Sequence, residues 1–308
     1  MKKSQDTIVD VLLAIYKEPL DLVEKSISSI LSQNKIAVKI ILIVDNPFYS
    51  SIDYIKGLGK NENITVIIND VNMGLAKSLN IGIESSTAKY IARMDADDVS
   101  DPERLNSQLK YLVNNNLDLI GCSVNKINID GDRIGKMHSV DDHEISTTIL
   151  KYKTFMFHPT WFGRSEVFKV IKYRNFTYAQ DVDFLHRTIL NGYRLGNCPD
   201  FLLDFRVAEE EHINCIKIYR QYLFRHFSYK ENTGRANDFD VEKCLSYISQ
   251  DTPSYRFEVA CKFFLGSISS RKITVKLAKL SAAFFLHNYA REQVYYKLFS
   301  FIKKVQLK

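Results

Sequence analysis

The sequence lacks the cysteine pattern of a disulfide framework or a zinc site. Its 308 residues include five cysteines, and no two of them form a C-x-x-C pair. Widely spaced thiols in odd number are typical of a reduced protein of the cytosol. No apolar run approaches the roughly 18 residues of a membrane-spanning helix. Because Asp10 leaves only a short apolar run near the start, at residues 11–15, a secretion signal is not expected either.

Glycine and proline are also scarce, with 12 and 6 residues. Together with 45% hydrophobic and 25% charged residues, this composition excludes the collagen-like and disordered classes. A chain of this length is sufficient for one large α/β domain and a helical appendage, or for two modest domains.

The first half of the chain alternates strand and helix patterns. Apolar runs predict buried strands at residues 9–16, 39–44 and 64–68, and another from residue 90 onward. Helical spacing of apolar residues follows Pro19 and recurs at residues 75–84. Ser100 and Glu103 match a capping box, which predicts that the next helix begins there. This alternation with short links predicts parallel βαβ units.

The pattern becomes mixed after residue 117. Asp130-Gly131 predicts a hairpin turn. Further helices are predicted at residues 143–152 and 179–191, and strands at residues 154–162 and 195–207. From about residue 210 the pattern is helical, with helices expected at residues 213–229, 241–249, 255–268, 274–289 and 291–304.

Three carboxylates, Asp95, Asp97 and Asp98, end the predicted strand that begins at Tyr90. A buried strand cannot enclose such a cluster, so the carboxylates must emerge at its carboxyl end, where α/β sheets bind ligands. Clustered negative charge favours a divalent cation. In an extended segment Asp95 and Asp97 point the same way, because strand side chains alternate. The alternative interpretation is a solvated acidic turn before the next helix.

Polar residues follow two other predicted strands, Tyr16-Lys17-Glu18 after the first and Asp45-Asn46 after the second. Parallel strands bring their carboxyl ends to one edge, where a nucleotide would sit. The sequence has no G-x-G-x-x-G after the first strand and no G-x-x-x-x-G-K-[ST]. Phosphates would therefore be held by a metal and by side chains, and Tyr16 and Glu18 are candidate nucleotide contacts.

Three segments together resemble the motifs of a known family. Residues 72–83 read Asn-Met-Gly-Leu-Ala-Lys-Ser-Leu-Asn-Ile-Gly-Ile, residues 90–98 end in the carboxylates above, and residues 179–184 read Ala-Gln-Asp-Val-Asp-Phe. In this order they resemble the N-x-G, metal-binding and E-D-x-D segments of the inverting glycosyltransferases of family 2. The resemblance covers roughly residues 8–207.

The resemblance implies a GT-A fold, a Rossmann-like α/β architecture in which helices flank a mixed sheet. A nucleotide-binding half would cover about residues 1–116 and an acceptor half about residues 117–208. Together these halves would form the catalytic domain, residues 1–208, and residues 209–308 would form an all-helical extension.

The resemblance also implies roles for individual residues. Asp45 would contact the base of a nucleotide-sugar donor, and Asn72 would be a further donor contact. Asp95 and Asp97 would position the ribose, the diphosphate and a Mn²⁺ or Mg²⁺ ion, with Asp97 as the direct metal ligand. Asp181 would be the general base.

The sequence departs from the family pattern at two places. Asn46-Pro47 follows Asp45 where many relatives have a glycine-containing turn, which puts the base and ribose contacts in doubt. Gln180 stands where the family usually has Glu, before the predicted base Asp181.

Three further residues have two interpretations each. His158, in the run Phe-His-Pro-Thr, is either a contact to the metal or diphosphate, as the resemblance implies, or a structural histidine. Lys77 either approaches a donor phosphate from its helix start or is a solvated lysine. Trp161 either stacks on an acceptor sugar or packs in the core.

Positive charge gathers at the C-terminus, where residues 259–308 hold ten Lys and Arg residues against the single Glu292. Apolar residues between these cations predict amphipathic helices. Such helices lie on an anionic membrane surface or pack as a bundle on the catalytic domain. No nucleic-acid motif accompanies the charge, so nucleic acid is not an expected partner.

The residues and the family that they resemble together imply a cytosolic, metal-dependent inverting glycosyltransferase, peripheral to the membrane. It would move a hexose or N-acetylhexosamine from a UDP-sugar to a lipid-linked glycan during assembly of a capsule, O-antigen or exopolysaccharide. Two alternatives stay open. The first is a nucleotidyltransferase, which would normally have a glycine-rich loop after the first strand, and residues 14–19 contain no glycine. The second is a non-catalytic scaffold, which would bind the nucleotide sugar without transferring the sugar.

Overall fold

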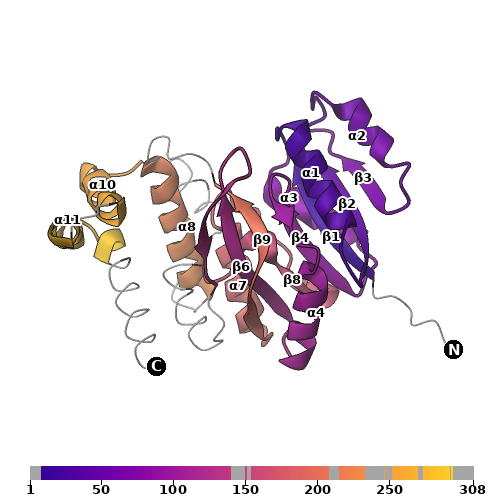
Figure 1. Ribbon diagram of the computed structural model, residues 1–308. Coiled ribbons are helices and arrows are strands. Elements are labelled where there is room, and N and C mark those ends of the chain that lie inside the picture. Colours follow the sequence, from indigo (N-terminus) through magenta and orange to yellow (C-terminus); the bar gives the residue numbers. More distant parts are fainter. Residues whose placement is uncertain are drawn as a thin grey trace. The chain divides into compact units, whose positions relative to one another are not determined.

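The computed structural model of the protein, shown in Figure 1, describes residues 8–139, 150, 154–207, 215–232, 246, 252–269, 273–291 and 293. The chain groups into two compact units. The first unit covers residues 1–148 and 154–209, and the second covers residues 149–153 and 210–308. The division of roles between a catalytic domain and an extension stays a prediction.

Four parallel strands form the first half of the sheet in the order β3-β2-β1-β4. They are β1 (Ile8–Ile15), β2 (Ala37–Val44), β3 (Ile64–Ile68) and β4 (Tyr90–Asp95). The helices between them are α1 (Leu20–Leu31), α2 (Ile52–Leu58) and α3 (Leu75–Ser85). The predicted parallel βαβ units are therefore confirmed, and α2 is an addition to them.

The second half of the sheet is mixed, as predicted. Its strands are β5 (Val99–Ser100), β6 (Leu119–Ile127), β7 (Arg133–Met137), β8 (Phe162–Arg164) and β9 (Leu195–Arg206). β8 is antiparallel to both β4 and β6, and β9 runs parallel to β6. The predicted hairpin joins β6 to β7 through Gly131, whose φ of 95° suits glycine.

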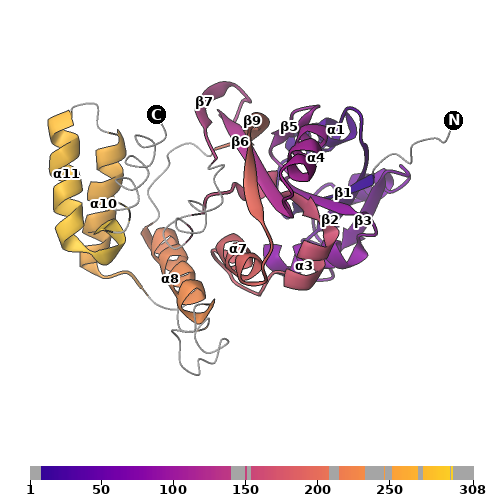
Figure 2. The same ribbon diagram turned by 90° about the horizontal axis from the view of Figure 1, so that it is seen from below.

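Helices cover both faces of this sheet. In Figure 2, α1 and α4 (Arg104–Asn114) lie on one face, and α3 and α7 (Gln180–Leu190) lie on the other. α6 (Ser165–Ile171) packs against α3 and α7. Because both faces are covered, the central strands are apolar throughout, and neighbouring residues such as Leu12 and Leu13 of β1 are both buried.

Two predictions about local structure are wrong. The strand expected at residues 154–162 begins only at Phe162, and His158–Thr160 form a 3-10 turn instead. Pro159 has no N–H group for a sheet, which explains why the strand does not form there. The capping box is also absent, because Ser100 belongs to β5 and α4 begins at Arg104.

A long-range contact replaces that predicted cap. Gln33, which follows α1, accepts the backbone N–H of Leu105 at 3.0 Å. A backbone N–H group in the first turn of α4 therefore finds its acceptor on a residue 72 positions earlier in the chain.

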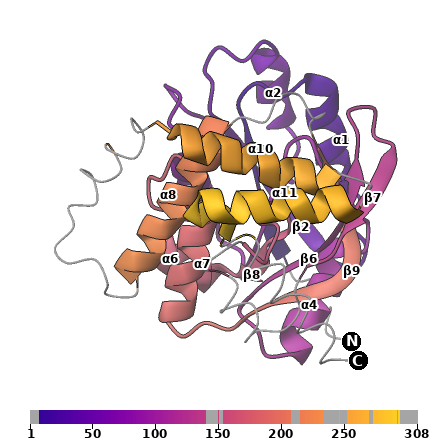
Figure 3. The same ribbon diagram turned by 90° about the vertical axis from the view of Figure 1, so that its left-hand side faces the viewer.

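The second unit is helical where it is described, with α8 (Cys215–Asn232), α10 (Tyr255–Ser269) and α11 (Ile273–Leu286). α10 and α11 lie side by side (Figures 2 and 3). Phe257 of α10 is fully buried among aromatic neighbours such as Tyr222 and Tyr289.

Some predictions about the helices fall on undescribed residues. The helices expected at residues 143–152, 241–249 and 291–304 lie almost entirely outside the described residues. So do Arg271 and Lys272, two of the cations behind the expected membrane contact. Within the described part of the chain, no helix combines the length and the apolar character needed to cross a membrane.

Candidate functional site

A cleft of about 450 Å³ opens at the carboxyl ends of β1, β2 and β4. It is lined by six of the predicted donor contacts, namely Tyr16, Glu18, Asp45, Asn72, Asp95 and Asp97. Lys77 is exposed on α3 and is not among the lining residues. The structure therefore brings these six residues to one cleft, and Lys77 lies on α3 outside its lining.

Asp45 holds one wall of this cleft in place. Its side chain is buried, and its Oδ1 accepts hydrogen bonds from Asn69 Nδ2 at 2.8 Å and from the Met73 N–H at 2.7 Å. Its Oδ2 accepts the N–H of Gly74 at 2.8 Å, where φ is 82°. An ionised carboxylate accepts about four hydrogen bonds, so Asp45 keeps acceptor capacity toward the cleft.

Asn72 and Glu18 support the turns on either side of the cleft. The side chain of Asn72 accepts the N–H of Gly74 at 3.0 Å, just before α3 begins. One Glu18 oxygen, Oε2, accepts the N–H groups of Tyr16 at 2.6 Å and Lys17 at 3.0 Å. Glu18 thus closes the turn after β1 and lines the cleft at the same time.

The acidic cluster consists of Asp95, Asp97 and Asp98, with one ligand atom of each lying within 4.8 Å of the others. Burial raises the pKa of Asp97, and the nearby charge of Asp95 raises it further. The same two causes raise the pKa of Asp98 well above its ordinary value. The charge of Asp95 therefore disfavours the charged forms of Asp97 and Asp98.

Two arginines contact this cluster, the buried Arg93 and the half-buried Arg206, and sequence reasoning missed both. Arg93 of β4 is buried and forms an ion pair with Asp95. Arg206, the last residue of β9, donates from Nε to the carbonyl of Asp97 at 2.8 Å, and its backbone N–H donates to Asp98 Oδ1 at 2.8 Å. A charged residue in the middle of an apolar strand is a signal in the sequence that could have identified Arg93. Arg206 gives no such signal, because it is more than a hundred residues away from the cluster in the sequence.

The cluster has the chemistry of a divalent cation site. Hard carboxylate oxygens are the ligands that Mg²⁺ and Mn²⁺ prefer. In addition, Asp98 Oδ2 is buried and has no hydrogen-bond partner among the described residues, which makes it an acceptor that a cation could satisfy. The residues present therefore fit a divalent metal ion, and Asp98 is a third carboxylate that could contact it.

His158 does not belong to this cluster. Its Nε2 is hydrogen-bonded to the hydroxyl of Tyr173 at 2.7 Å, and its ring packs edge-on against Trp161. Burial holds the pKa of His158 well below its ordinary value, with help from the Arg93 charge. These contacts favour the structural interpretation of His158 over its interpretation as a metal ligand, and Trp161 is fully buried in the core.

Asp181 lies in the first turn of α7 and is partly exposed. Burial strongly raises the pKa of Tyr173, and the charges of Asp181 and Asp95 act on the same phenol in the same direction. Both carboxylates are therefore within electrostatic reach of one buried side chain. The residue at the helix N-cap, Ala179, has a φ of 55°, a left-handed conformation that non-glycine residues seldom adopt.

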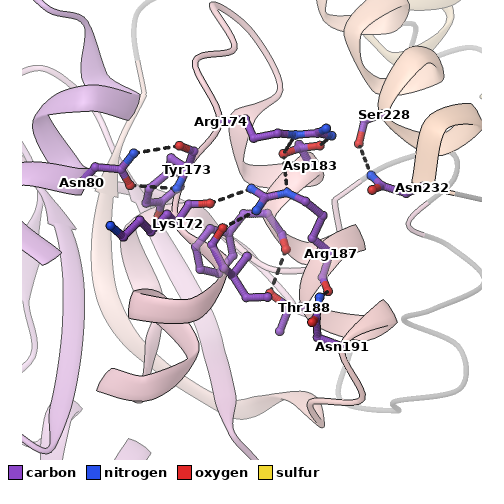
Figure 4. A network of polar contacts seen from close by, with 12 residues as sticks. Asn80, Lys172, Tyr173, Arg174, Asp183, Arg187, Thr188, Asn191, Ser228 and Asn232 are labelled. Carbon is purple, nitrogen blue, oxygen red and sulfur yellow. Dashed lines mark hydrogen bonds and ion pairs between the residues drawn. The ribbon is translucent and has the colours of Figure 1, made fainter. Parts of the chain in front are cut away.

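Asp183, which belongs to the same sequence motif, is almost completely buried. It forms ion pairs with Arg174 and Arg187, the latter at 2.9 Å between Nε and Oδ2 (Figure 4). Asp183 therefore stabilises the start of α7, a role that was not predicted.

Comparison with known proteins places the chain in a family. The model described as Glycosyl transferase family 2 matches residues 10–172. An uncharacterized glycosyltransferase of Methanocaldococcus jannaschii is 31% identical over 238 residues, which cover 75% of this chain and 81% of that protein.

Two relatives carry names from polysaccharide biosynthesis. The amylovoran biosynthesis glycosyltransferase AmsE of Erwinia amylovora is 28% identical over 65% of this chain and 76% of its own length. The O-antigen biosynthesis glycosyltransferase WbnJ of Escherichia coli is 29% identical over 65% of this chain and 80% of its own length.

Among solved structures, S. aureus TarS 1-349 in complex with UDP-GlcNAc has the same fold. The TM-score is 0.58 at 13% identity, over 90% of this chain and 79% of that chain. This likeness confirms the predicted fold, a mixed sheet flanked by helices. From the matched family model and these relatives, we conclude that the chain is a glycosyltransferase and belongs to glycosyltransferase family 2.

Proposed function

We propose that this enzyme transfers one sugar, with inversion, from a UDP-sugar to a glycan acceptor in a metal-dependent reaction. The observation that carries the proposal is the cleft at the strand ends, which collects Asp45, Asp95 and Asp97. The TarS structure, which contains UDP-GlcNAc, supports the choice of a uridine donor.

The donor would lie along this cleft with its two ends held by different residues. Asp45, which retains acceptor capacity, would contact the base, and Asn72 would be a further donor contact. Asp95 and Asp97 would position the ribose. Asp97 and Asp95, joined by Asp98, would hold the metal next to the diphosphate. When bound, the divalent ion would offset negative charge that grows on the departing diphosphate.

Asp181 would act as the general base. The acceptor hydroxyl oxygen forms a bond to the anomeric carbon while the bond from that carbon to the diphosphate oxygen breaks. The hydroxyl proton passes to the Asp181 carboxylate, and UDP leaves. Attack from the face opposite the leaving group inverts the anomeric centre. Partial exposure of Asp181 gives an acceptor access to it.

The acceptor would be a lipid-linked glycan of a bacterial surface polysaccharide. The names of AmsE and WbnJ support this class of pathway. The excess of basic residues at positions 259–308 would bring the enzyme to the anionic membrane surface that carries such acceptors.

A panel of nucleotide sugars tests the proposal. The purified enzyme is incubated with each nucleotide sugar, with and without Mn²⁺, and the UDP released by slow transfer of the sugar to water is measured. We expect release from one UDP-sugar that depends on Mn²⁺. Asp181→Asn should bind that donor with unchanged affinity and release UDP at least about a hundredfold more slowly. Donor binding without metal-dependent release by the wild type would indicate a non-catalytic scaffold instead.

A further inference from the structure

The connection between α6 and α7 is held by a side chain from α3. Asn80 donates from Nδ2 to the carbonyl of Tyr173 at 2.7 Å and accepts the Tyr173 N–H on Oδ1 at 2.8 Å (Figure 4). One amide therefore satisfies both backbone groups of a single residue, as a neighbouring strand would. Two bonds in opposite directions fix both the position and the orientation of the Tyr173 backbone relative to α3.

The side chain of Tyr173 fixes the same segment from a second direction. It is buried, its hydroxyl pairs with His158 Nε2 at 2.7 Å, and its ring stacks on Trp161. It also contacts Phe184 of α7, with 4.8 Å between ring centroids. Tyr173 is therefore packed directly against the helix that carries Asp181.

Side chains of α7 bind the residues on both sides of Tyr173. Asp183 pairs with Arg174, the residue after it. Arg187 pairs with Asp183 and donates from Nη2 to the carbonyl of Lys172, the residue before it, at 2.6 Å (Figure 4). Any displacement of this segment would therefore displace the start of α7.

The donor cleft lies at the other end of this chain of contacts. α3 begins at Leu75, and both Leu75 and Gly74 line the cleft, where Asp45 holds the Gly74 N–H. α3 packs closely on the sheet, because a Cβ added at its Gly82 would lie 2.9 Å from the side chain of Ile43 on β2 and 3.0 Å from that of Leu12 on β1. Asn80 thus connects a helix of the donor site to the segment that positions α7.

We propose that Asn80 is a positioning residue, which sets the place of the Asp181 carboxylate relative to the bound donor through the backbone of Tyr173. This inference rests on the proposed role of Asp181 as the base. It also gives a function to the second asparagine of the segment at residues 72–83, which the donor contacts leave unexplained.

Substitution of Asn80 should separate catalysis from donor binding. Asn80→Ala removes both hydrogen bonds, and misplacement of a reacting group by about 1 Å costs on the order of a hundredfold in rate. We therefore expect kcat for UDP release, from the nucleotide sugar that the panel selects, to fall about tenfold to a hundredfold. The Kd for UDP with Mn²⁺ should not change, because the cleft residues keep their own contacts.

Two further variants make the test specific. Glu84→Ala removes the exposed 2.9 Å ion pair to Lys172, which joins the same two segments, and should leave kcat unchanged. Asn80→Asp keeps the acceptor for the Tyr173 N–H but places an oxygen against the Tyr173 carbonyl, so its kcat should also fall. The Asn80→Asp variant provides the test if Asn80→Ala does not fold.

The double variant Asn80→Ala with Asp181→Asn distinguishes the inference from the proposed function. If Asn80 acts through Asp181, its substitution adds no further loss once the base is gone. A full additional loss in the double variant, or an unchanged kcat in both Asn80 variants, would overturn the role of Asn80. Full activity of Asp181→Asn alone would instead overturn the base assignment.

Discussion

Asp181 and Asp183 lie two positions apart on α7, and their surroundings give them different roles. Asp183 is 1% exposed and is enclosed by two arginines, whereas Asp181 is partly exposed at the start of the helix. A carboxylate that is sealed between cations stabilises the fold, and one that a substrate can reach is available for chemistry.

Removal of the Asp183 charge should destabilise the protein. In Asp183→Asn the partly buried cations Arg174 and Arg187 lose their counter-charge, so we expect the free energy of unfolding to fall by about 2–3 kcal/mol. Urea unfolding followed by circular dichroism measures this change. The control Asp53→Ala, whose side chain is 94% exposed, should stay within about 0.5 kcal/mol of the wild type. Equal urea midpoints for both variants would show that the ion pairs of Asp183 contribute nothing to the stability of the fold.

Sequence reasoning could place residues whose position follows from the strand pattern. Tyr16, Asp45 and Asp97 follow apolar runs, and the parallel sheet does bring them to one cleft. Arg206 could not be found in this way, since it lies 109 positions from the carbonyl of Asp97 that it contacts. The pairing of strands that are distant in the sequence determines such contacts, and the local sequence pattern does not predict that pairing.

At the scale of elements, β8 links the two halves of the sheet with three residues. Its central residue, Gly163, lies so close to the neighbouring backbone that an added Cβ would be 2.7 Å from the Asp118 carbonyl oxygen and 3.1 Å from Leu119 Cα. Backbone atoms cannot move aside as a side chain can. This glycine is therefore required by the close approach of β6.

Gly163→Ala should destabilise the sheet for this reason. We expect the free energy of unfolding to fall by about 1–3 kcal/mol, the usual range for overpacking. Gly135→Ala is a matched control on the exposed strand β7, where the nearest atom to an added Cβ is 3.9 Å away. Thermal unfolding of the two variants provides the comparison. A melting temperature of Gly163→Ala equal to that of Gly135→Ala would contradict the packing argument.

The elements that could be predicted from sequence are those with long apolar runs. The strand at residues 64–68 was predicted with the bounds that β3 has. The helices α2 and α6, each seven residues long, were missed because two turns give too little periodicity to recognise. The start of α4 was misplaced because Gln33, a distant residue, provides the contact that a local cap was expected to make.

At the scale of the whole molecule, the strand order explains why the site forms where it does. β1, β2 and β4 are parallel neighbours, so their carboxyl ends bring Tyr16, Asp45 and Asp95 to one edge. The antiparallel strand β8 follows β4 in the sheet. In the order β3-β2-β1-β4 the direction of the strand order reverses between β1 and β4. The site lies at the carboxyl ends of these strands, and such a switch point is the usual place for a ligand in an open α/β sheet.

Calorimetric titration of the full chain with UDP tests the central claim, that this cleft binds a nucleotide-diphosphate donor through a metal. In the presence of Mn²⁺ we predict that the wild type binds UDP, and that the Kd rises at least about tenfold in Asp97→Ala or after EDTA, since a metal ligand or the metal is then missing. Asp53→Ala, outside the cleft, should bind as the wild type does. Equal affinity for UDP in the wild type and Asp97→Ala, with and without Mn²⁺, would contradict the account.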